Sequence, residues 1–209
     1  IYGSNSRLLI KFHEDYINNK INFPQEWTKT VCKFGILNFG VSMISLKHNN
    51  EINDTDYRIF LSRLSEPLKE KISLGSCGLD FGCGTGPALA DMLTQDGFKV
   101  SLYDPFFYPD ESVLSEQYDF ITCTETAEHF CDPFKEFNAL DDLLKPGGWL
   151  GVMTSFLTSD EMFENWYYRR DPTHVTFYCE KTFQVIASQR NWKCEIKSKD
   201  VVLLQKNYD

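Results

Sequence analysis

Hydrophobic and polar residues follow two different periods along the chain, and the first clear period is helical. Asp54 and Thr55 are helix-capping residue types, and apolar side chains then recur at helical spacing from Tyr57 to Ile72. Gly75 follows at the place where a helix stop is expected. The pattern therefore predicts one amphipathic helix with an apolar face that needs a partner surface.

Strand-like and helix-like patterns alternate through the rest of the chain. Strands are predicted over 77–81, 98–103, 118–123 and 149–156, helices over 87–97, 133–144 and 182–189, and a closing hairpin over 192–198 and 200–206. Strands that alternate with helices indicate an α/β fold with a mostly parallel sheet. Before residue 50 the patterns are weaker, and only a short strand over 37–43 is predicted.

Composition and charge narrow the function classes. The 209 residues carry a net charge of −9, which argues against a protein that grips a nucleic-acid backbone. The seven cysteines are odd in number and form no C-x-x-C pair, so neither a zinc ribbon nor a secreted disulfide framework is expected. We expect a cytoplasmic protein without a bound metal. No segment reaches the roughly 20 apolar residues of a membrane span.

A glycine-rich turn joins the strand at 77–81 to the helix after it. The sequence Gly82-Cys83-Gly84-Thr85-Gly86 has a glycine at every second position, which lets the backbone approach a ligand closely. The dinucleotide fingerprint needs a further glycine where Pro87 stands. Asp80, just before the turn, would repel a diphosphate but suits a cationic ligand.

The next strand ends in a second carboxylate, Asp104, 18 residues after Gly86. A carboxylate at that place can accept both hydroxyl groups of a ribose. A tight turn without a ligand would account for the glycines, but it gives no reason for the two acidic residues. We therefore interpret the segment as a nucleoside site.

Four segments together resemble one known superfamily. The segments 80–86, 118–121 and 144–150, with Asp104 between the first two, are similar in sequence and order to the motifs of class I S-adenosylmethionine-dependent methyltransferases. The resemblance covers about 53–206. It implies a Rossmann-like, doubly wound sheet of seven mostly parallel strands, of which the last is antiparallel. It also implies an N-terminal extension at 1–50 that covers the cofactor site and a methyltransferase domain at 51–209.

The resemblance assigns S-adenosylmethionine as cofactor, with S-adenosylhomocysteine as product. It places the methionine end at the glycine turn, the ribose at Asp104 and the adenine near Phe106 and Phe107. The cofactor-binding residues that it implies are Asp80, Gly82, Cys83, Gly84, Thr85, Gly86, Asp104, Pro105, Phe106, Cys123, Thr124 and Glu125.

One unit of the chain is shorter than the superfamily pattern. Only 13 residues separate Asp104 from Tyr118, where a helix and a full strand are usual. We expect a turn around Glu111 to Ser115 instead. The acidic residue that often contacts the adenine amine has no clear counterpart, so Phe106-Phe107-Tyr108 would replace it by stacking.

The candidate catalytic residues are His129, His174 and Glu125. His129 ends the string Glu125-Thr126-Ala127-Glu128-His129 directly after a core strand, and His174 lies in Asp171-Pro172-Thr173-His174. Both strings resemble those of small-molecule methyltransferases of the quinone-biosynthesis type. Either imidazole can act as a base near neutral pH, and Asp171 would orient that of His174. The alternatives are a helix-capping role for His129 and a structural role for His174.

The leading hypothesis is methyl transfer to the oxygen or nitrogen of a small-molecule acceptor. A nicotinamide oxidoreductase is disfavoured by Pro87, whereas a non-catalytic cofactor-binding or assembly module of the same fold stays open. Seven aromatic residues lie between Phe156 and Tyr178, and three more follow Asp104. We interpret these rings as the wall and lid of the pocket, with a second small core as the alternative. The sequence does not indicate the oligomeric state.

Overall fold

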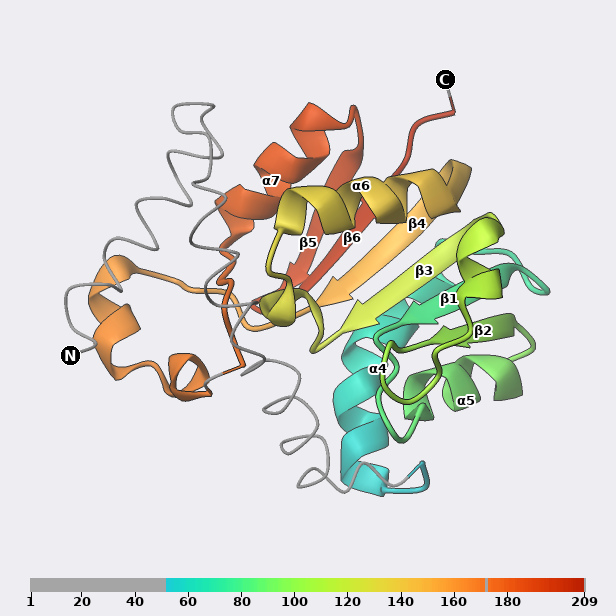
Figure 1. The fold of residues 1–209 in the computed structure, drawn as a ribbon, viewed down its shortest axis with the longest axis horizontal. Coiled ribbons are helices and arrows are strands. Elements are labelled where there is room, and N and C mark those ends of the chain that lie inside the picture. The colour runs from blue at the N-terminus through green and yellow to red at the C-terminus, as the bar shows by residue number, and fades with distance from the viewer. Residues whose placement is uncertain (1–51, 172, 209) are drawn as a thin grey trace.

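The computed structural model describes residues 52–171 and 173–208, and these residues form one α/β unit (Figure 1). Its helices are α4 (Thr55–Lys69), α5 (Ala88–Gln95), α6 (Pro133–Leu143) and α7 (Glu180–Gln189). Its strands are β1 (Cys77–Phe81), β2 (Lys99–Tyr103), β3 (Tyr118–Thr124), β4 (Leu144–Met153), β5 (Lys193–Ser198) and β6 (Val201–Gln205). The predicted strand over 37–43 and the extension at 1–50 lie outside the described residues.

The strands form one sheet in the order β2-β1-β3-β4-β6-β5. The strands β2, β1, β3 and β4 are parallel to one another, and β6 is antiparallel to both β4 and β5. The expected α/β class and the antiparallel last strand are therefore confirmed. The carboxyl ends of β1, β2, β3 and β4 share one edge of the sheet, where ligands bind in folds of this kind.

The sheet lies between two pairs of helices (Figure 1). Side chains of β6 alternate between the faces: Val201 and Leu203 pack with α4 and α5, whereas Val202 and Leu204 pack with α6 and α7. Because successive strand side chains point to opposite faces, a strand that is buried on both faces needs a continuous apolar run. This packing holds the ligand edge of the sheet between two rigid layers.

The sheet of the described residues has six strands, so the expectation of seven is not confirmed. Between β2 and β3 the chain forms the 3-10 helix η1 (Glu111–Ser115), which the side chain of Asp110 caps. The shortened unit is thus confirmed at the predicted residues. The 13 residues between Asp104 and Tyr118 are too few for a crossover helix and a strand, and β2 is left as the edge of the sheet.

Two element boundaries differ from the sequence-based ones. The helix α6 begins as predicted, with Asp132 accepting a hydrogen bond from Lys135 N, but Leu144 already pairs with Tyr118 in the sheet. The residues 145–148, which separate the predicted helix over 133–144 from the predicted strand over 149–156, are therefore the first part of β4. At the other end β4 stops at Met153, and Phe156 makes only an isolated bridge with Tyr178.

The described cysteines fall into two groups. Five of them, Cys77, Cys83, Cys123, Cys179 and Cys194, are free thiols, whereas Cys131 is in a disulfide bond. The bond at Cys131 was not predicted from the sequence. Among the described residues, no helix is both long and apolar enough to span a membrane.

Candidate functional site

One continuous cavity of about 1190 Å³ lies along the carboxyl ends of the parallel strands. It reaches from the glycine turn after β1 to two short 3-10 segments, η2 (Ala127–His129) and η4 (Tyr167–Arg170). Its volume exceeds the roughly 300–1,000 Å³ that is usual for a small-molecule pocket. The cavity therefore has room for a nucleoside and a second small molecule at once.

The glycine turn forms one wall of the cavity and is hydrogen-bonded to the end of β2. The amides of Gly82 and Cys83 both donate to the carbonyl of Tyr103. Gly82 and Gly84 have φ angles of 79° and 65°, which L side chains rarely adopt. A Cβ on Gly82 would lie 2.3 Å from the Thr126 methyl group, whereas a Cβ on Gly84 would meet no atom within 4 Å. Gly84 thus leaves open space on the cavity side.

Asp104 stands beside this turn and organises two backbone segments at once. One carboxylate oxygen accepts from Gly84 N, and the other accepts from Phe106 N and Phe107 N. The side chain is buried, with 8% of its surface exposed. It therefore ties the glycine turn to the loop after β2, and both segments line the cavity.

Asp80 is a buried carboxylate at the end of β1. It is 3% exposed and accepts a hydrogen bond of 2.7 Å from the Thr122 hydroxyl. Burial raises the pKa of Asp80 to about 6, with Asp104 adding to the shift and the Thr122 bond opposing it. A cation in the cavity would stabilise the ionised form, as expected for a residue that faces a positively charged ligand.

Two residues at the end of β3 have features that are typical of a ligand site. The hydroxyl of Thr124 is buried and has no hydrogen-bond partner among the described residues, and such orphaned groups are costly unless a ligand provides a hydrogen bond. Glu125 has a φ angle of 48°, a strained conformation for a non-glycine residue. Burial and the neighbouring Glu128 raise the pKa of Glu125 to about 8.

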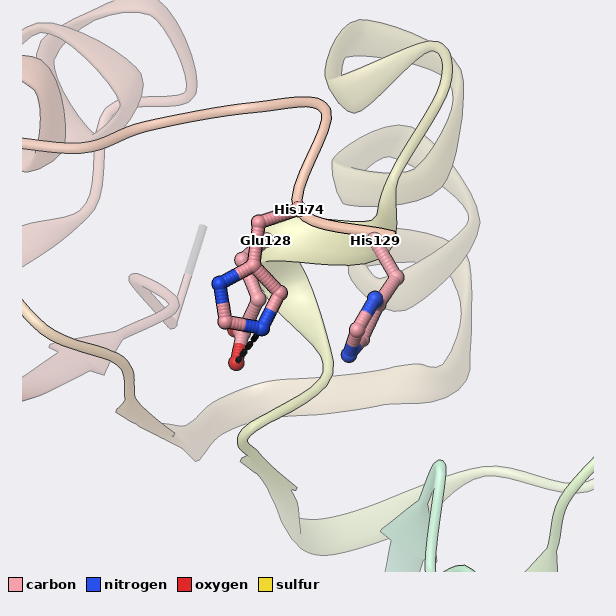
Figure 2. Close-up of side chains that lie close together, drawn as sticks. All are labelled: Glu128, His129 and His174. Carbon is pink, nitrogen blue, oxygen red and sulfur yellow. Dashed lines mark ion pairs between the residues drawn. The ribbon is translucent and has the colours of Figure 1, made fainter. Parts of the chain in front are cut away.

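The far end of the cavity is a cluster of Glu128, His129 and His174, which lie close together (Figure 2). The two imidazole rings are 5.0 Å apart between centroids, and Nε2 of His174 lies 3.9 Å from Oε1 of Glu128. Each ring is held by a backbone carbonyl, His129 Nδ1 at 3.0 Å from Thr173 O and His174 Nδ1 at 2.7 Å from Tyr168 O. Burial lowers the pKa of His174, while the Glu128 charge opposes that shift.

Glu128 is fully buried and is the centre of the cluster. Its two oxygens accept hydrogen bonds from the hydroxyls of Tyr168, at 2.5 Å, and Thr154, at 2.9 Å. The Tyr168 hydroxyl also lies 3.0 Å from Thr154 Oγ1 and 3.5 Å from Glu125 Oε2. A buried carboxylate needs such partners, and they fix its position relative to both histidines.

The cluster is assembled from segments that are far apart in sequence. The amides of Val175 and Thr176 both donate to the backbone carbonyl of Glu128, and the Thr176 hydroxyl donates to Phe130 O. Asp171 accepts from the amide and hydroxyl of Thr173. Asp171 lies 4.0 Å from His174 Nε2. It therefore shapes the loop, whereas the sequence predicted that it orients the imidazole ring directly.

Most of the predicted site residues line the cavity. They are Asp80, Gly82, Cys83, Gly84, Thr85, Gly86, Asp104, Pro105, Phe106, Thr124, Glu125, His129 and His174. Cys123 does not line it, because this residue of β3 points into the core under α6 and α7 and is fully buried. Sequence reasoning assigned no role to Glu128, although it quoted the string that contains it, and it missed Tyr57 and Phe60 of α4, which also line the cavity.

The aromatic residues before α7 divide between the two interpretations. Phe163, Trp166 and Phe177 pack against one another in tilted and edge-to-face contacts, with ring centroids 5.2–6.4 Å apart, and form a small second core around the buried Phe163. Tyr167 and Tyr168 line the cavity instead, Tyr167 being 70% exposed. The prediction of a wall is therefore met by some of these rings only.

Comparison with known proteins places this site in a family. A methyltransferase-domain family model matches residues 50–195, and the chain belongs to this family of class I S-adenosylmethionine-dependent methyltransferases. Ubiquinone biosynthesis O-methyltransferases of Salmonella arizonae and Salmonella newport are each 33% identical to it over the matched segment. That segment covers 34% of this chain and 38% of either relative, so the match spans about two fifths of their length.

Solved structures support the same fold. The plantazolicin methyltransferase BpumL in complex with SAH aligns with a TM-score of 0.56 and 13% identity, and the alignment covers 94% of this chain and 99% of that one. A second BpumL structure, with a monoazolic desmethylPZN analog and SAH, aligns with a TM-score of 0.53 and 15% identity over 88% and 98% of the chains. At this identity the likeness shows the fold alone.

Proposed function

We propose that this protein transfers a methyl group from S-adenosylmethionine to an oxygen or nitrogen of a small-molecule acceptor. The observation that carries the proposal is one continuous cavity, which joins a nucleoside-type wall at Gly82–Gly86 and Asp104 to the Glu128, His129 and His174 cluster. Bound S-adenosylmethionine supplies the methyl group: its S–CH₃ bond breaks as the acceptor forms its own bond to that carbon, and neutral S-adenosylhomocysteine remains.

The residues at the glycine end fit such a cofactor. Gly84 leaves open space where a side chain would stand, the buried Thr124 hydroxyl has no hydrogen-bond partner within 52–171 and 173–208, and Asp80 presents a buried carboxylate that suits a positive charge. Asp104 would receive the ribose, while Phe106, 43% exposed, offers a ring face to the adenine. These features support the predicted cofactor set, apart from Cys123.

The far end supports acceptor activation. Because a carbonyl oxygen only accepts, the Nδ1 atoms of His129 and His174 carry the protons of their hydrogen bonds to Thr173 O and Tyr168 O. In the neutral rings both Nε2 atoms then keep a lone pair. An acceptor hydroxyl or ammonium placed there can pass its proton to Nε2 or to Glu125 as the methyl group arrives.

A two-stage experiment tests the proposal. First, S-adenosylhomocysteine is titrated into the purified protein by calorimetry and thermal denaturation, and we expect binding with a rise in Tm. Second, phenols and amines are screened for cofactor-dependent formation of S-adenosylhomocysteine. An unchanged melting curve at saturating cofactor would contradict the proposal at once.

The role of the histidines has its own test. We expect His129→Gln or His174→Gln to lower kcat for the acceptor found in the screen and to shift its pH profile, with cofactor affinity unchanged. Glu164→Gln, an exposed carboxylate on a 3-10 helix away from the cavity, serves as control. A loss of cofactor affinity in both histidine variants would instead indicate a structural role.

A further inference from the structure

The lining of the cavity is strongly unbalanced in charge. Among the described residues that line it, Arg170 is the only lysine or arginine. Six acidic residues line the same cavity, namely Asp80, Asp104, Glu125, Glu128, Glu136 and Asp171. Arg63 of α4, which is not among the lining residues, forms its ion pair with Asp200. The cavity therefore attracts ligands that carry positive charge and repels anions.

The proposed cofactor would be served by only part of this charge. Asp80 and Asp104 belong to the glycine end, whereas Glu125, Glu128 and Asp171 line the end assigned to the acceptor. Glu128 is fully buried, so its charge is poorly screened by water. Because a buried charge is costly unless it is paired, an acceptor with a carboxylate or phosphate group is disfavoured at this end.

The two imidazole rings at this end present electron pairs to the ligand. Their Nδ1 atoms donate to Thr173 O and Tyr168 O, so the Nε2 atom of each neutral ring is an acceptor. Nε2 of His174 lies 3.9 Å from Oε1 of Glu128, which brings a lone pair next to a carboxylate. A positively charged donor between these groups would stabilise both of them, together with Nε2 of His129.

The spacing of these groups suits an ammonium nitrogen. Acceptors that surround one tetrahedral nitrogen at about 2.8 Å lie about 4.6 Å from one another. One ligand-type atom each from Glu128, His129 and His174 lies within 4.8 Å of the other two, and the three side chains lie close together (Figure 2). A single –NH₃⁺ group can therefore donate hydrogen bonds to all three residues at once.

We infer that the methyl acceptor is a primary or secondary amine, which binds at this cluster as its ammonium ion. The inference rests on the proposed function in one respect, because it assigns the substrate class of that same site. The rings of Tyr167 and Tyr168 also line the cavity, and ring faces attract cations. A phenol or alcohol has a single donor hydrogen and no charge, so it would leave two of the three acceptor groups without a hydrogen bond.

The ammonium ion must lose one proton before it can react. One N–H proton passes to Nε2 of His129 or His174, which leaves the amine nitrogen with a free electron pair. This pair forms the new N–CH₃ bond while the S–CH₃ bond of the cofactor breaks and its electrons stay on sulfur. The product leaves as an N-methylammonium ion, and the imidazolium ion then releases its proton to water.

The carboxyl group of Glu125 provides a second signal of a bound cation. Burial and the charges of Glu128 and Asp200 raise the pKa of Glu125 to about 8, and Tyr168 and Arg63 oppose that rise. Glu125 is therefore mostly protonated at pH 7, and a positive charge beside it would lower its pKa again. Binding of an ammonium ion should release up to about one proton per chain, whereas a neutral ligand should release none.

The test uses the full-length protein saturated with S-adenosylhomocysteine, so that no turnover occurs. Calorimetry compares three matched sets of probes, in which benzylamine, tyramine and hexylamine each accompany the alcohol and the carboxylate of the same skeleton. In at least one set we expect the amine to bind at least about tenfold more tightly than its alcohol, and we expect no binding of any carboxylate. Titrations in two buffers of different ionisation enthalpy measure the released proton at pH 7.

Charge-matched variants assign the preference to the cavity. Glu125→Gln should lower the affinity for the amine several-fold and abolish proton release, with the affinity for the alcohol unchanged. Glu164→Gln removes the same charge from an exposed position outside the lining and should change neither quantity. Arg170→Gln removes the one cationic side chain among the described lining residues and should raise the affinity for the amine.

Two outcomes would overturn the inference: no set in which the amine binds more tightly than its alcohol, or a preference that Glu125→Gln leaves unchanged. Binding of S-adenosylhomocysteine is measured first on the same samples. A protein that binds S-adenosylhomocysteine but does not prefer amines refutes the amine class and leaves the proposed methyl transfer standing. A protein that does not bind S-adenosylhomocysteine refutes the proposed function itself.

Discussion

The two ends of the cavity are built in different ways. At the glycine end the backbone forms the surface of the cavity. The turn Gly82–Gly86 lies between β1 and α5, and its hydrogen-bond partner Asp104 follows the neighbouring strand β2. At the other end the surface is made by side chains of η2 and of the segment before α7. Glu128 and its partner Tyr168 are 40 residues apart in sequence.

The two ends of the cavity therefore depend on different properties of the sequence. Backbone conformation at the glycine end follows from local residue types, because glycine permits the φ angles of the turn. The carboxylate–histidine end depends on which distant segments pack together, because a buried charge is tolerated only among specific partners. Substitutions should therefore affect cofactor binding at one end and acceptor chemistry at the other.

The largest expected effect is that of Asp104→Ala at the glycine end. The change leaves Gly84 N, Phe106 N and Phe107 N without their shared acceptor, and removes the proposed ribose contact. We expect S-adenosylhomocysteine affinity, measured by calorimetry, to fall at least about 100-fold. Asp110→Ala, an exposed cap of η1, is the matched control, and equal losses in both variants would contradict the comparison.

The second prediction concerns Asp80 and pH. Its folded-state pKa of about 6 lies above the unfolded value, so ionisation of Asp80 destabilises the fold. The stability contributed by neutral Asp80 is complete below about pH 4 and is lost as pH rises through 6. Asp80→Asn, which can still accept from Thr122, should remove this loss of roughly 2–3 kcal/mol. Urea denaturation at pH 4.5 and 7.5 without cofactor measures it.

The same variant should bind the cofactor less well, since the ionised carboxylate no longer faces the ligand's positive charge. A variant that gains stability at pH 7.5 while its cofactor-induced rise in Tm shrinks would sharpen the separation of the two ends. An Asp80→Asn protein with the wild-type pH dependence would refute the assigned cause.

The third prediction compares two glycines with the same backbone strain. Gly84 and Gly75 have φ angles of 65° and 83°, and a Cβ on either meets no atom within 4 Å. Both alanine variants should therefore lose a similar stability, about 1–2 kcal/mol. Only Gly84→Ala, whose methyl group would enter the cavity, should weaken cofactor binding, by about tenfold. Equal affinities for the two variants would exclude Gly84 from the cofactor site.

The smallest effect is expected at the acceptor end, for Tyr167→Ala. This ring is 70% exposed and lines the cavity, so stability should change by less than about 0.5 kcal/mol while KM for the acceptor rises a few-fold. Phe163→Ala in the small second core, where Phe163 is 4% exposed, should instead cost about 3 kcal/mol. Similar denaturation midpoints for both would mean that the aromatic segment is a single unit.

The features that could be predicted from the sequence are those that depend on neighbouring residues, as at the glycine end of the cavity. The cap of α4 at Asp54, the glycine turn and the shortened unit at Glu111–Ser115 depend on neighbouring residues, and the sequence predicted each. The start of β4 at Leu144 was missed because pairing with Tyr118 overrides the local turn residues. Cys123 was placed at the cofactor because position along a strand does not tell which face a residue uses.

Glu128 shows the limit most clearly. Its sequence string indicated a polar turn at the sheet edge, but its burial depends on hydroxyls supplied by Tyr168 and Thr154. The residues near Glu128 in sequence do not indicate that Tyr168 and Thr154 are its partners. A buried acidic residue beside a histidine is therefore a feature that only the folded arrangement reveals.

The bonds to the carbonyl oxygen of Glu128 have a kinetic consequence. Two amides, those of Val175 and Thr176, donate to this one oxygen, and His174 is their immediate neighbour. Any outward swing of that segment breaks both bonds and withdraws His174 from Glu128. If His174 has the proposed catalytic role, opening of this segment would separate it from Glu128, and the frequency of opening would then set an upper limit on turnover for any ligand that enters or leaves there.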